Sequence, residues 1–183
     1  VFQYDVTIIA TEQLQKPIIY ELSSKVKFID LAINYNRSKS YFSPANVLKF
    51  LRNVWLIQTY ILKNKPHFIN VASHIPITYF LPFLLTKAKT MKEFHFTKFS
   101  RPLVGMKAKA LNYIEGKYDY LIVLSNEERQ FYPSPNAVVI ANPIEQLAPS
   151  TTNYSQNENI ALFVGRPAPV KQLEKLVEVW TKF

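Results

Sequence analysis

A glycine, an arginine and a lysine stand close together in the stretch from Val164 to Leu173. Gly165 lets the backbone approach a ligand closely, because it carries no side chain. Arg166 and Lys171 add two cations at the start of an expected helix, whose first amide groups also attract anions. The pattern therefore indicates a cradle for a diphosphate. It is not a Walker P-loop, and surface charges beside a turn would leave the same pattern.

His95 lies near the carboxyl end of a strand that we expect over Thr90 to Phe96. Residues at the carboxyl ends of parallel strands project toward the crevice where such sheets bind ligands. Glu93 falls on the same strand face, because strand side chains alternate with a period of two. The pair suits general-base or electrostatic catalysis. A hydrogen-bonded structural histidine and a solvated carboxylate are the plainer alternatives.

Two further side chains follow expected strands. His74 comes after the strand Phe68 to Ala72, and Ser125 comes after the strand Tyr120 to Leu124. We expect His74 at the edge of the cleft. Ser125 precedes Asn126, Glu127 and Glu128 and is expected to cap a short helix, with a contact to the cleft as a secondary role.

The segment from Lys87 to Lys117 is strongly basic. Glu93 and Glu115 are its acidic residues, and phenylalanines are interleaved among the cations. This mixture favours a peripheral contact with anionic lipids, and a solvated basic face is the alternative. The cations are Lys87, Lys89, Lys92, Lys98, Arg101, Lys107, Lys109 and Lys117.

The composition sets limits on these hypotheses. The 183 residues carry a net charge of +9, which favours an anionic partner without selecting one, and 48% of them are hydrophobic, enough for a folded core. Because cysteine is absent, thiol catalysis and thiolate metal sites are excluded. No other cluster of metal-ligand residues is evident, so we expect no metal. The longest apolar run, Ile75 to Leu85, is too short to cross a bilayer and contains two prolines.

Strand-like and helix-like segments alternate along the chain. We expect helices at Ala45 to Lys63, Pro76 to Leu85 and Leu103 to Lys117, with Ser43 and Pro44 starting the first. The expected strands are Tyr4 to Ala10, Pro17 to Leu22, Val26 to Ile33, Phe68 to Ala72, Thr90 to Phe96, Tyr120 to Leu124, Ala137 to Ile140 and Ile160 to Val164. This alternation predicts an α/β fold whose mostly parallel, Rossmann-like sheet has flanking helices.

Three blocks together resemble glycosyltransferase family 4, whose members have the GT-B fold of two Rossmann-like domains facing a cleft. Val164 to Arg166, with Lys171, is similar to the opening of that family's donor domain. The run Tyr118 to Ser125 resembles the family's strand that ends in serine. Ile140 to Ile144, which contains Asn142, resembles the turn before the interdomain linker. The order and spacing of the blocks match as well.

The resemblance implies a retaining transfer of a sugar from a nucleotide-sugar donor to a polysaccharide or lipid-linked acceptor, without a cofactor or a metal. It implies that Arg166 and Lys171 hold the donor diphosphate and that His95 contacts the acceptor or the transferred sugar. Asn142 joins His74 and Ser125 as a candidate contact in the cleft. We expect a cytoplasmic protein that is peripheral at the inner face of the cell membrane, with a role in polysaccharide biosynthesis of the cell envelope.

The same resemblance predicts the domain organisation. Residues 1–145 would form the acceptor-side domain without its first strand, 146–158 a linker, and 159–183 the truncated start of the donor domain. We therefore expect an internal fragment with little transferase activity of its own. A non-enzymatic, basic α/β module that binds nucleic acid is the alternative, supported by the charge and the aromatic residues, although no nucleic-acid motif is present. A nicotinamide-dependent oxidoreductase is weaker, because no glycine-rich fingerprint follows any strand.

Overall fold

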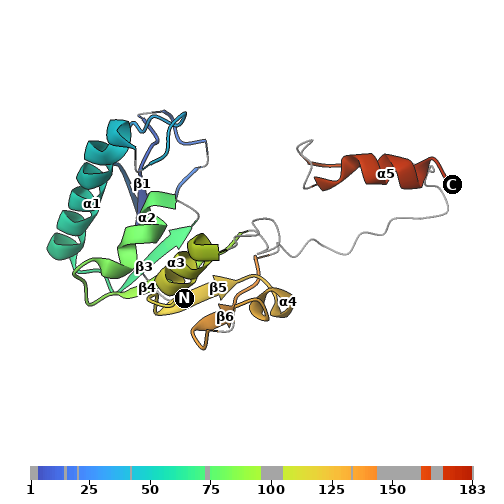
Figure 1. Cartoon of the computed structure of the whole chain (residues 1–183). Helices are drawn as coiled ribbons and strands as arrows, with labels where there is room; N and C mark the ends of the chain where they lie inside the picture. Colours follow the sequence, from blue (N-terminus) through green and yellow to red (C-terminus); the bar gives the residue numbers. More distant parts are fainter. Residues whose placement is uncertain are drawn as a thin grey trace. The chain divides into compact units, whose positions relative to one another are not determined.

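All strand pairs among the described residues are parallel. The computed structural model describes residues 4–14, 16–19, 21–41, 43–72, 75–95, 105–132, 134–143, 162–165 and 171–182. The chain divides into two compact units, Val1–Thr97 with Leu103–Ala141, and Lys98–Pro102 with Asn142–Phe183. Figure 1 shows the elements in chain order.

The first unit contains two parallel sheets. Strands β1 (Val6–Ala10) and β2 (Val26–Asp30) form a two-stranded sheet. Strands β3 (Phe68–Ala72), β4 (Lys89–Glu93), β5 (Tyr120–Val123) and β6 (Ala137–Val139) form a four-stranded sheet in that order. The sequential order follows from repeated crossovers of one hand. The predicted parallel α/β architecture is thus confirmed.

Helices connect the strands of the four-stranded sheet. Helix α1 (Pro44–Asn64) precedes β3, while α2 (Ile75–Phe80) and the 3₁₀ helix η1 (Leu81–Phe83) lie between β3 and β4. Helix α3 (Gly105–Glu115) leads to β5, and the short α4 (Asn126–Arg129) leads to β6. Helix α5 (Leu173–Trp180) belongs to the second unit.

The core lies on one face of the four-stranded sheet. Val71, Leu121 and Val123 point to this face and pack with Ile57 and Ile61 of α1. Each buried aliphatic side chain of this kind contributes about 1.5–3 kcal/mol to folding. The opposite face carries exposed side chains, among them those of Phe68 and Asn70. Ile122 points to this second face and is buried, so the face is only partly open.

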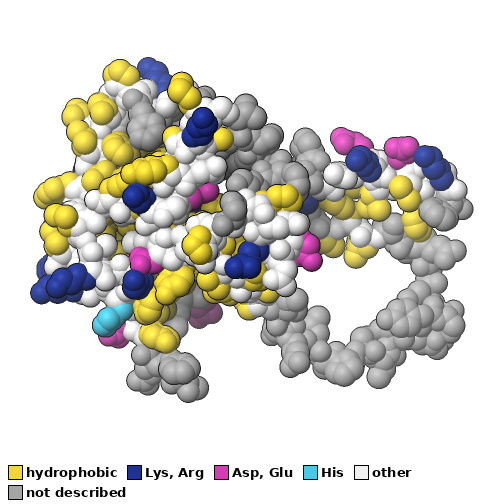
Figure 2. Space-filling view, turned by 60° about the horizontal axis from the view of Figure 1, so that its bottom comes forward, with side chains coloured by type: hydrophobic (Ala, Val, Ile, Leu, Met, Phe, Trp, Pro, Cys, Tyr) yellow, Lys and Arg dark blue, Asp and Glu magenta, His cyan; other side chains and the backbone are white. Residues whose placement is uncertain are grey.

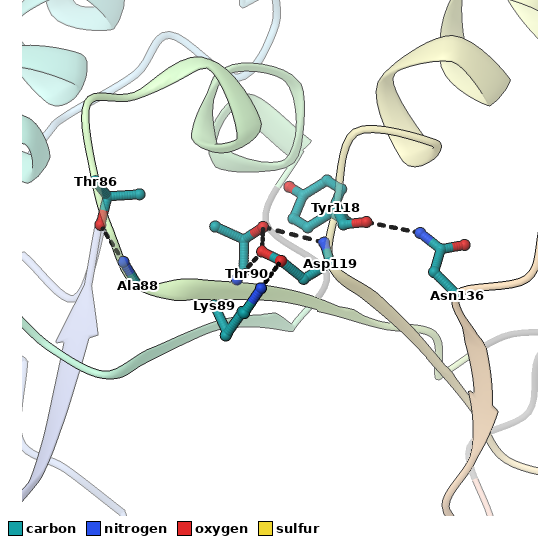
Figure 3. A network of polar contacts seen from close by, with 7 residues as sticks. All are labelled: Thr86, Ala88, Lys89, Thr90, Tyr118, Asp119 and Asn136. Carbon is teal, nitrogen blue, oxygen red and sulfur yellow. Dashed lines mark hydrogen bonds and ion pairs between the residues drawn. The ribbon is translucent and has the colours of Figure 1, made fainter.

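A polar network fixes the amino-terminal ends of β4 and β5 (Figure 3). Asp119 accepts hydrogen bonds from the backbone N–H of Thr90 at 2.8 Å and from its hydroxyl at 3.1 Å, and Nζ of Lys89 lies 2.7 Å away. The pKa of Asp119 is lowered chiefly by the hydrogen bond from Lys89. Asn136 donates to the backbone carbonyl of Tyr118 at 2.6 Å. This hydrogen bond joins the start of β6 to the segment just before β5. Strand register is therefore set at the edge opposite to the carboxyl ends.

Several predicted elements match closely, and the α1 boundary is one of them. The helix begins at Pro44 after the extended residue Ser43, and its last residue is Asn64. Lys65, with a positive φ of 46°, is the C-cap residue. The Ser43 hydroxyl, however, makes no capping hydrogen bond. The β3 strand and the α5 helix agree with the expected spans to the residue.

Other expectations were wrong. The described residues between Pro17 and Leu22 form no strand, since proline lacks a donor and Ile18 and Ile19 are exposed. The helix expected over Pro76 to Leu85 tightens to 3₁₀ geometry at Pro82. Residues 162–164, the described end of the strand expected from Ile160, are not in a strand. Leu162 and Val164 are exposed there, without the partner strand that would satisfy their backbone.

Candidate active site at the carboxyl edge of the sheet

Glu93 and His95 come together at the carboxyl end of β4. Glu93 is the last residue of the strand, and its Oε1 lies 3.8 Å from Nε2 of His95. The imidazole is 38% exposed and the carboxylate 25%. At this separation the carboxylate attracts a protonated imidazole but is too far away for a direct hydrogen bond. The arrangement is an accessible acid–base pair.

Asn70 of β3 is a third member of this cluster. Its Nδ2 donates to Oε2 of Glu93 at 3.0 Å. The register pairs Ala72 with Glu93 and Asn70 with Met91. Asn70 and Glu93 therefore lie on the same face of the sheet, offset by two residues along the strands. The small Ala72 leaves room for the carboxylate to reach Asn70. Each carboxylate oxygen of Glu93 therefore faces a different polar group.

Sequence reasoning did not identify Asn70. One signal was present, because Asn70 is the single polar residue in the otherwise apolar strand Phe68–Ala72. Asn70 is exposed, so burial does not explain a polar residue at this position. Its partner comes from the next strand of the sheet, and that neighbour relationship is visible only in the fold.

The core side of β4 anchors the strand that carries this site. Nζ of Lys92 lies 2.6 Å from Oε1 of Glu115, and the two side chains are only 10% and 7% exposed. The ammonium also lies 4.3 Å from the ring centroid of Phe94, whose ring packs against that of Tyr132. Burial, followed by the nearby charge of Glu115, raises the pKa of Tyr132. The pair joins the end of α3 to β4 directly beneath Glu93.

Ser125 acts as the predicted helix cap. Its hydroxyl accepts a hydrogen bond from the backbone N–H of Glu128 at 3.2 Å. The pKa of Glu127 is lowered by a hydrogen bond with the same hydroxyl. Both interactions engage the Ser125 hydroxyl within its own turn. A ligand bound here would therefore contact the turn but not a free Ser125 hydroxyl.

The remaining candidate residues lie elsewhere or outside the described residues. Gly165, Lys171 and Asn142 belong to the second unit. A side chain at Gly165 would approach the ring of Phe163 to 3.3 Å. Lys171 is exposed two residues before α5, whose N-cap residue Gln172 makes no side-chain cap hydrogen bond. His74 and Arg166 lie outside the described residues.

The basic segment contains cations of two kinds. Lys89 is paired with Asp119, and Lys92 is buried against Glu115. Lys87, Lys109 and Lys117 are exposed, although Nζ of Lys117 lies 4.9 Å from the ring centroid of Tyr113. Lys98 and Arg101, and the side chain of Lys107, lie outside the described residues. The exposed charge of this segment is therefore smaller than its composition suggests.

Within the described residues no group of three or more His, Asp or Glu side chains could hold a metal ion. None of the described helices has the length and apolar content needed to span a bilayer. The chain matches no protein-family model, no curated protein and no solved structure.

Proposed function

We propose that this chain belongs to a retaining, sugar-nucleotide-dependent glycosyltransferase resembling family 4, and that its first unit binds the acceptor. The observation that carries the proposal is the Asn70–Glu93–His95 cluster at the carboxyl edge of a parallel sheet. That edge is where ligands bind to folds of this architecture. The sequence blocks that resemble the family supply the reaction class.

In the proposed reaction the bond between the anomeric carbon of the sugar and the diphosphate oxygen breaks, and the nucleoside diphosphate leaves. A hydroxyl oxygen of the acceptor forms the new bond to the same carbon and gives up its proton to a base. His95 is accessible enough to take that role or to stabilise developing charge. Glu93, held by Asn70, attracts the imidazole once it is protonated.

In this proposal the donor diphosphate is held by the second unit. Lys171 supplies a cation beside the start of α5, where backbone amides lack a side-chain cap, and Arg166 supplies another. Glu174 stands in the first turn of the same helix and opposes an anion there. The attraction of the two cations for the diphosphate must therefore exceed its repulsion by Glu174. Removal of a cation should then weaken diphosphate binding measurably.

The donor site is tested by titrating UDP, GDP and ADP by calorimetry into the protein that contains this chain. We expect one of them to bind, and Lys171→Gln to weaken that binding about tenfold, as loss of a charge-assisted contact does. Lys175→Gln is the matched control, because Lys175 is exposed on α5 three residues beyond Gln172. Equal affinities of the two variants, or no binding of any diphosphate, would count against the proposal.

The nucleic-acid alternative uses the same positive charge. Two of the cations it requires, Lys89 and Lys92, are already paired with Asp119 and Glu115. Binding of a single-stranded oligonucleotide that weakens steeply as salt rises would favour it. A membrane contact through Lys87, Lys109 and Lys117 remains part of the transferase proposal, as a site for anionic lipid head groups.

A further inference from the structure

Helix α1 has two apolar faces, and only one of them packs on the protein. Phe50, Val54, Ile57 and Ile61 belong to the core or pack against it. Spacings of three, four and seven residues place a second set of apolar side chains in one stripe, about 120° around the helix from the core side chains. This outer stripe consists of Leu48, Leu51, Trp55 and Leu62, all of them exposed.

The exposure of the outer stripe is large. Leu48 is 76% exposed and Trp55 64%. A helix that only covers a core has polar residues on the rest of its surface, so exposed leucines and a tryptophan outside the core-facing side require another explanation. Contiguous apolar surface of this kind marks a contact with a partner or a membrane.

A loop segment extends the stripe sideways. Gln58 of α1 exchanges two hydrogen bonds with the backbone of Leu85, donating to its carbonyl at 3.0 Å and accepting from its N–H at 2.9 Å. The Leu85 side chain is 74% exposed, and Phe83 close by is exposed as well. The reciprocal bonds hold this apolar loop beside the helix, and the exposed Lys87 follows it.

The charges of α1 are all positive. Its cations are Lys49, Arg52 and Lys63, and the helix contains no acidic residue. Counting 100° per residue, all three fall on one flank of the outer stripe. Within the described part of the chain none of them takes part in an ion pair. Figure 2 shows hydrophobic side chains along the left-hand edge, the side on which α1 lies in Figure 1, with Lys and Arg side chains beside them.

We infer that α1 is a membrane-docking helix that lies flat on an anionic lipid surface, with its outer stripe in the head-group region and its cations on lipid phosphates. Apolar side chains with tryptophan on one face and Lys or Arg beside them are the features of interfacial helices. The helix of 21 residues gives a contact line about 30 Å long. Trp55 lies near its middle.

The charge of α1 favours an anionic membrane over a second copy of the chain as the partner of the outer stripe. Two α1 helices packed through their outer stripes would bring two sets of unpaired cations together, with no acidic residue on either helix to compensate. An anionic membrane supplies the missing negative charge and also accepts the apolar side chains. The surface differs from the Lys87 to Lys117 segment, and the inference does not depend on the transferase proposal.

The test is co-sedimentation of the chain with vesicles of phosphatidylcholine alone and of phosphatidylcholine mixed with phosphatidylglycerol. We expect binding to the mixed vesicles. The double variant Leu51→Gln/Trp55→Gln should bind at least about tenfold more weakly, because it loses the apolar contact. Arg52→Gln/Lys63→Gln should lose about fivefold for each charge. Both variants alter exposed side chains, so their thermal unfolding should stay close to that of the parent chain.

A second readout uses tryptophan fluorescence. The chain has two tryptophans, Trp55 and Trp180, so a Trp180→Phe variant reports on Trp55 alone. Its emission should shift to the blue on mixed vesicles, whereas that of Trp55→Phe should not. Ile19→Gln and Lys25→Gln/Lys27→Gln, at exposed positions outside α1 and outside the Lys87 to Lys117 segment, are the matched controls and should change binding by less than the α1 variants do.

Each opposite result overturns the inference. Failure to bind mixed vesicles would exclude a membrane role for α1. Losses in the Ile19 and Lys25/Lys27 variants as large as those in the α1 variants would show that the contact is not specific to α1. A dimer in sedimentation velocity that disappears in Leu51→Gln/Trp55→Gln, without vesicle binding, would show that a second copy covers the stripe.

Discussion

The carboxylate of Glu93 links two neighbouring strands, since its Oε2 accepts a hydrogen bond from Nδ2 of Asn70 at 3.0 Å while its Oε1 faces Nε2 of His95 at 3.8 Å. Asn70 thereby limits the orientations of the Glu93 carboxylate. Because it would act on the site through Glu93, we regard it as a positioning residue.

If Asn70 positions Glu93, the Asn70→Ala variant of the transferase should lose about tenfold in kcat, with KM nearly unchanged, because misorientation acts on the chemical step. Its stability should fall by less than about 1 kcal/mol, since the lost hydrogen bond is exposed. Asn112→Ala, an exposed change on α3, is the control. Steady-state kinetics that show equal kcat for the two variants would remove Asn70 from the site.

The buried pair of Lys92 and Glu115 should be costly to break. Glu115→Leu leaves a buried ammonium without its counter-charge and should reduce the free energy of unfolding by about 3–5 kcal/mol. The double change Lys92→Met/Glu115→Leu should recover most of that loss. The exposed pair of Lys182 and Glu178 on the second unit is the comparison, where removal should cost less than about 0.5 kcal/mol. Urea unfolding of the four variants measures the coupling.

Asp119 should make stability depend on pH at the acid end. Its pKa lies below the ordinary 3.8, because the carboxylate accepts hydrogen bonds from Lys89 and Thr90. A lowered folded-state pKa means that the unfolded chain takes up the proton first, so the stabilisation is present above 3.8 and is lost as the pH falls toward the folded value. We expect Asp119→Asn to lose about 1 kcal/mol near neutral pH and to show a shallower decline below that window. Parallel acid curves for the variant and the parent chain would contradict this.

The two serines that precede helices should differ in importance. Ser125→Ala removes a hydroxyl that caps α4 and should cost about 1 kcal/mol. Ser43→Ala should cost almost nothing, because the Ser43 hydroxyl makes no cap hydrogen bond and Pro44 already sets the start of α1. Thermal unfolding of both variants gives the comparison. A larger loss for Ser43 would mean that its hydroxyl has a role in the folded chain that its contacts do not reveal.

Local signals in the sequence were sufficient for most elements of the first unit. Pro44 and Lys65 bound α1 as expected, and the apolar runs that became β3 and β5 have a length and composition typical of buried strands. The strand expected at Pro17 to Leu22 was wrong, because branched residues favour a strand only where a neighbouring strand and a packing face exist. The same reason explains the absence of a strand at Leu162 to Val164.

The candidate site was only partly accessible from the sequence. Glu93 and His95 are only two residues apart in the chain, so their proximity follows from the sequence, although β4 ends at Glu93 and His95 lies beyond it rather than within the strand as expected. Asn70 and the Asp119 network depend on which strands become neighbours, and no local pattern encodes that. The burial of Lys92 was missed because a lysine inside a basic segment resembles its exposed neighbours until its partner, Glu115, is placed beside it.

The role of His95 is the central claim, and the transfer rate of His95→Gln tests it most directly. Release of nucleoside diphosphate from a sugar nucleotide in the presence of acceptor should be followed in the protein that contains this chain, with His67→Gln as the control at an exposed position. We expect kcat to fall by about 10²–10⁴-fold for His95→Gln, as for loss of a general base, and to stay unchanged for His67→Gln. Equal rates for the two variants would contradict an active site at the carboxyl edge of the sheet.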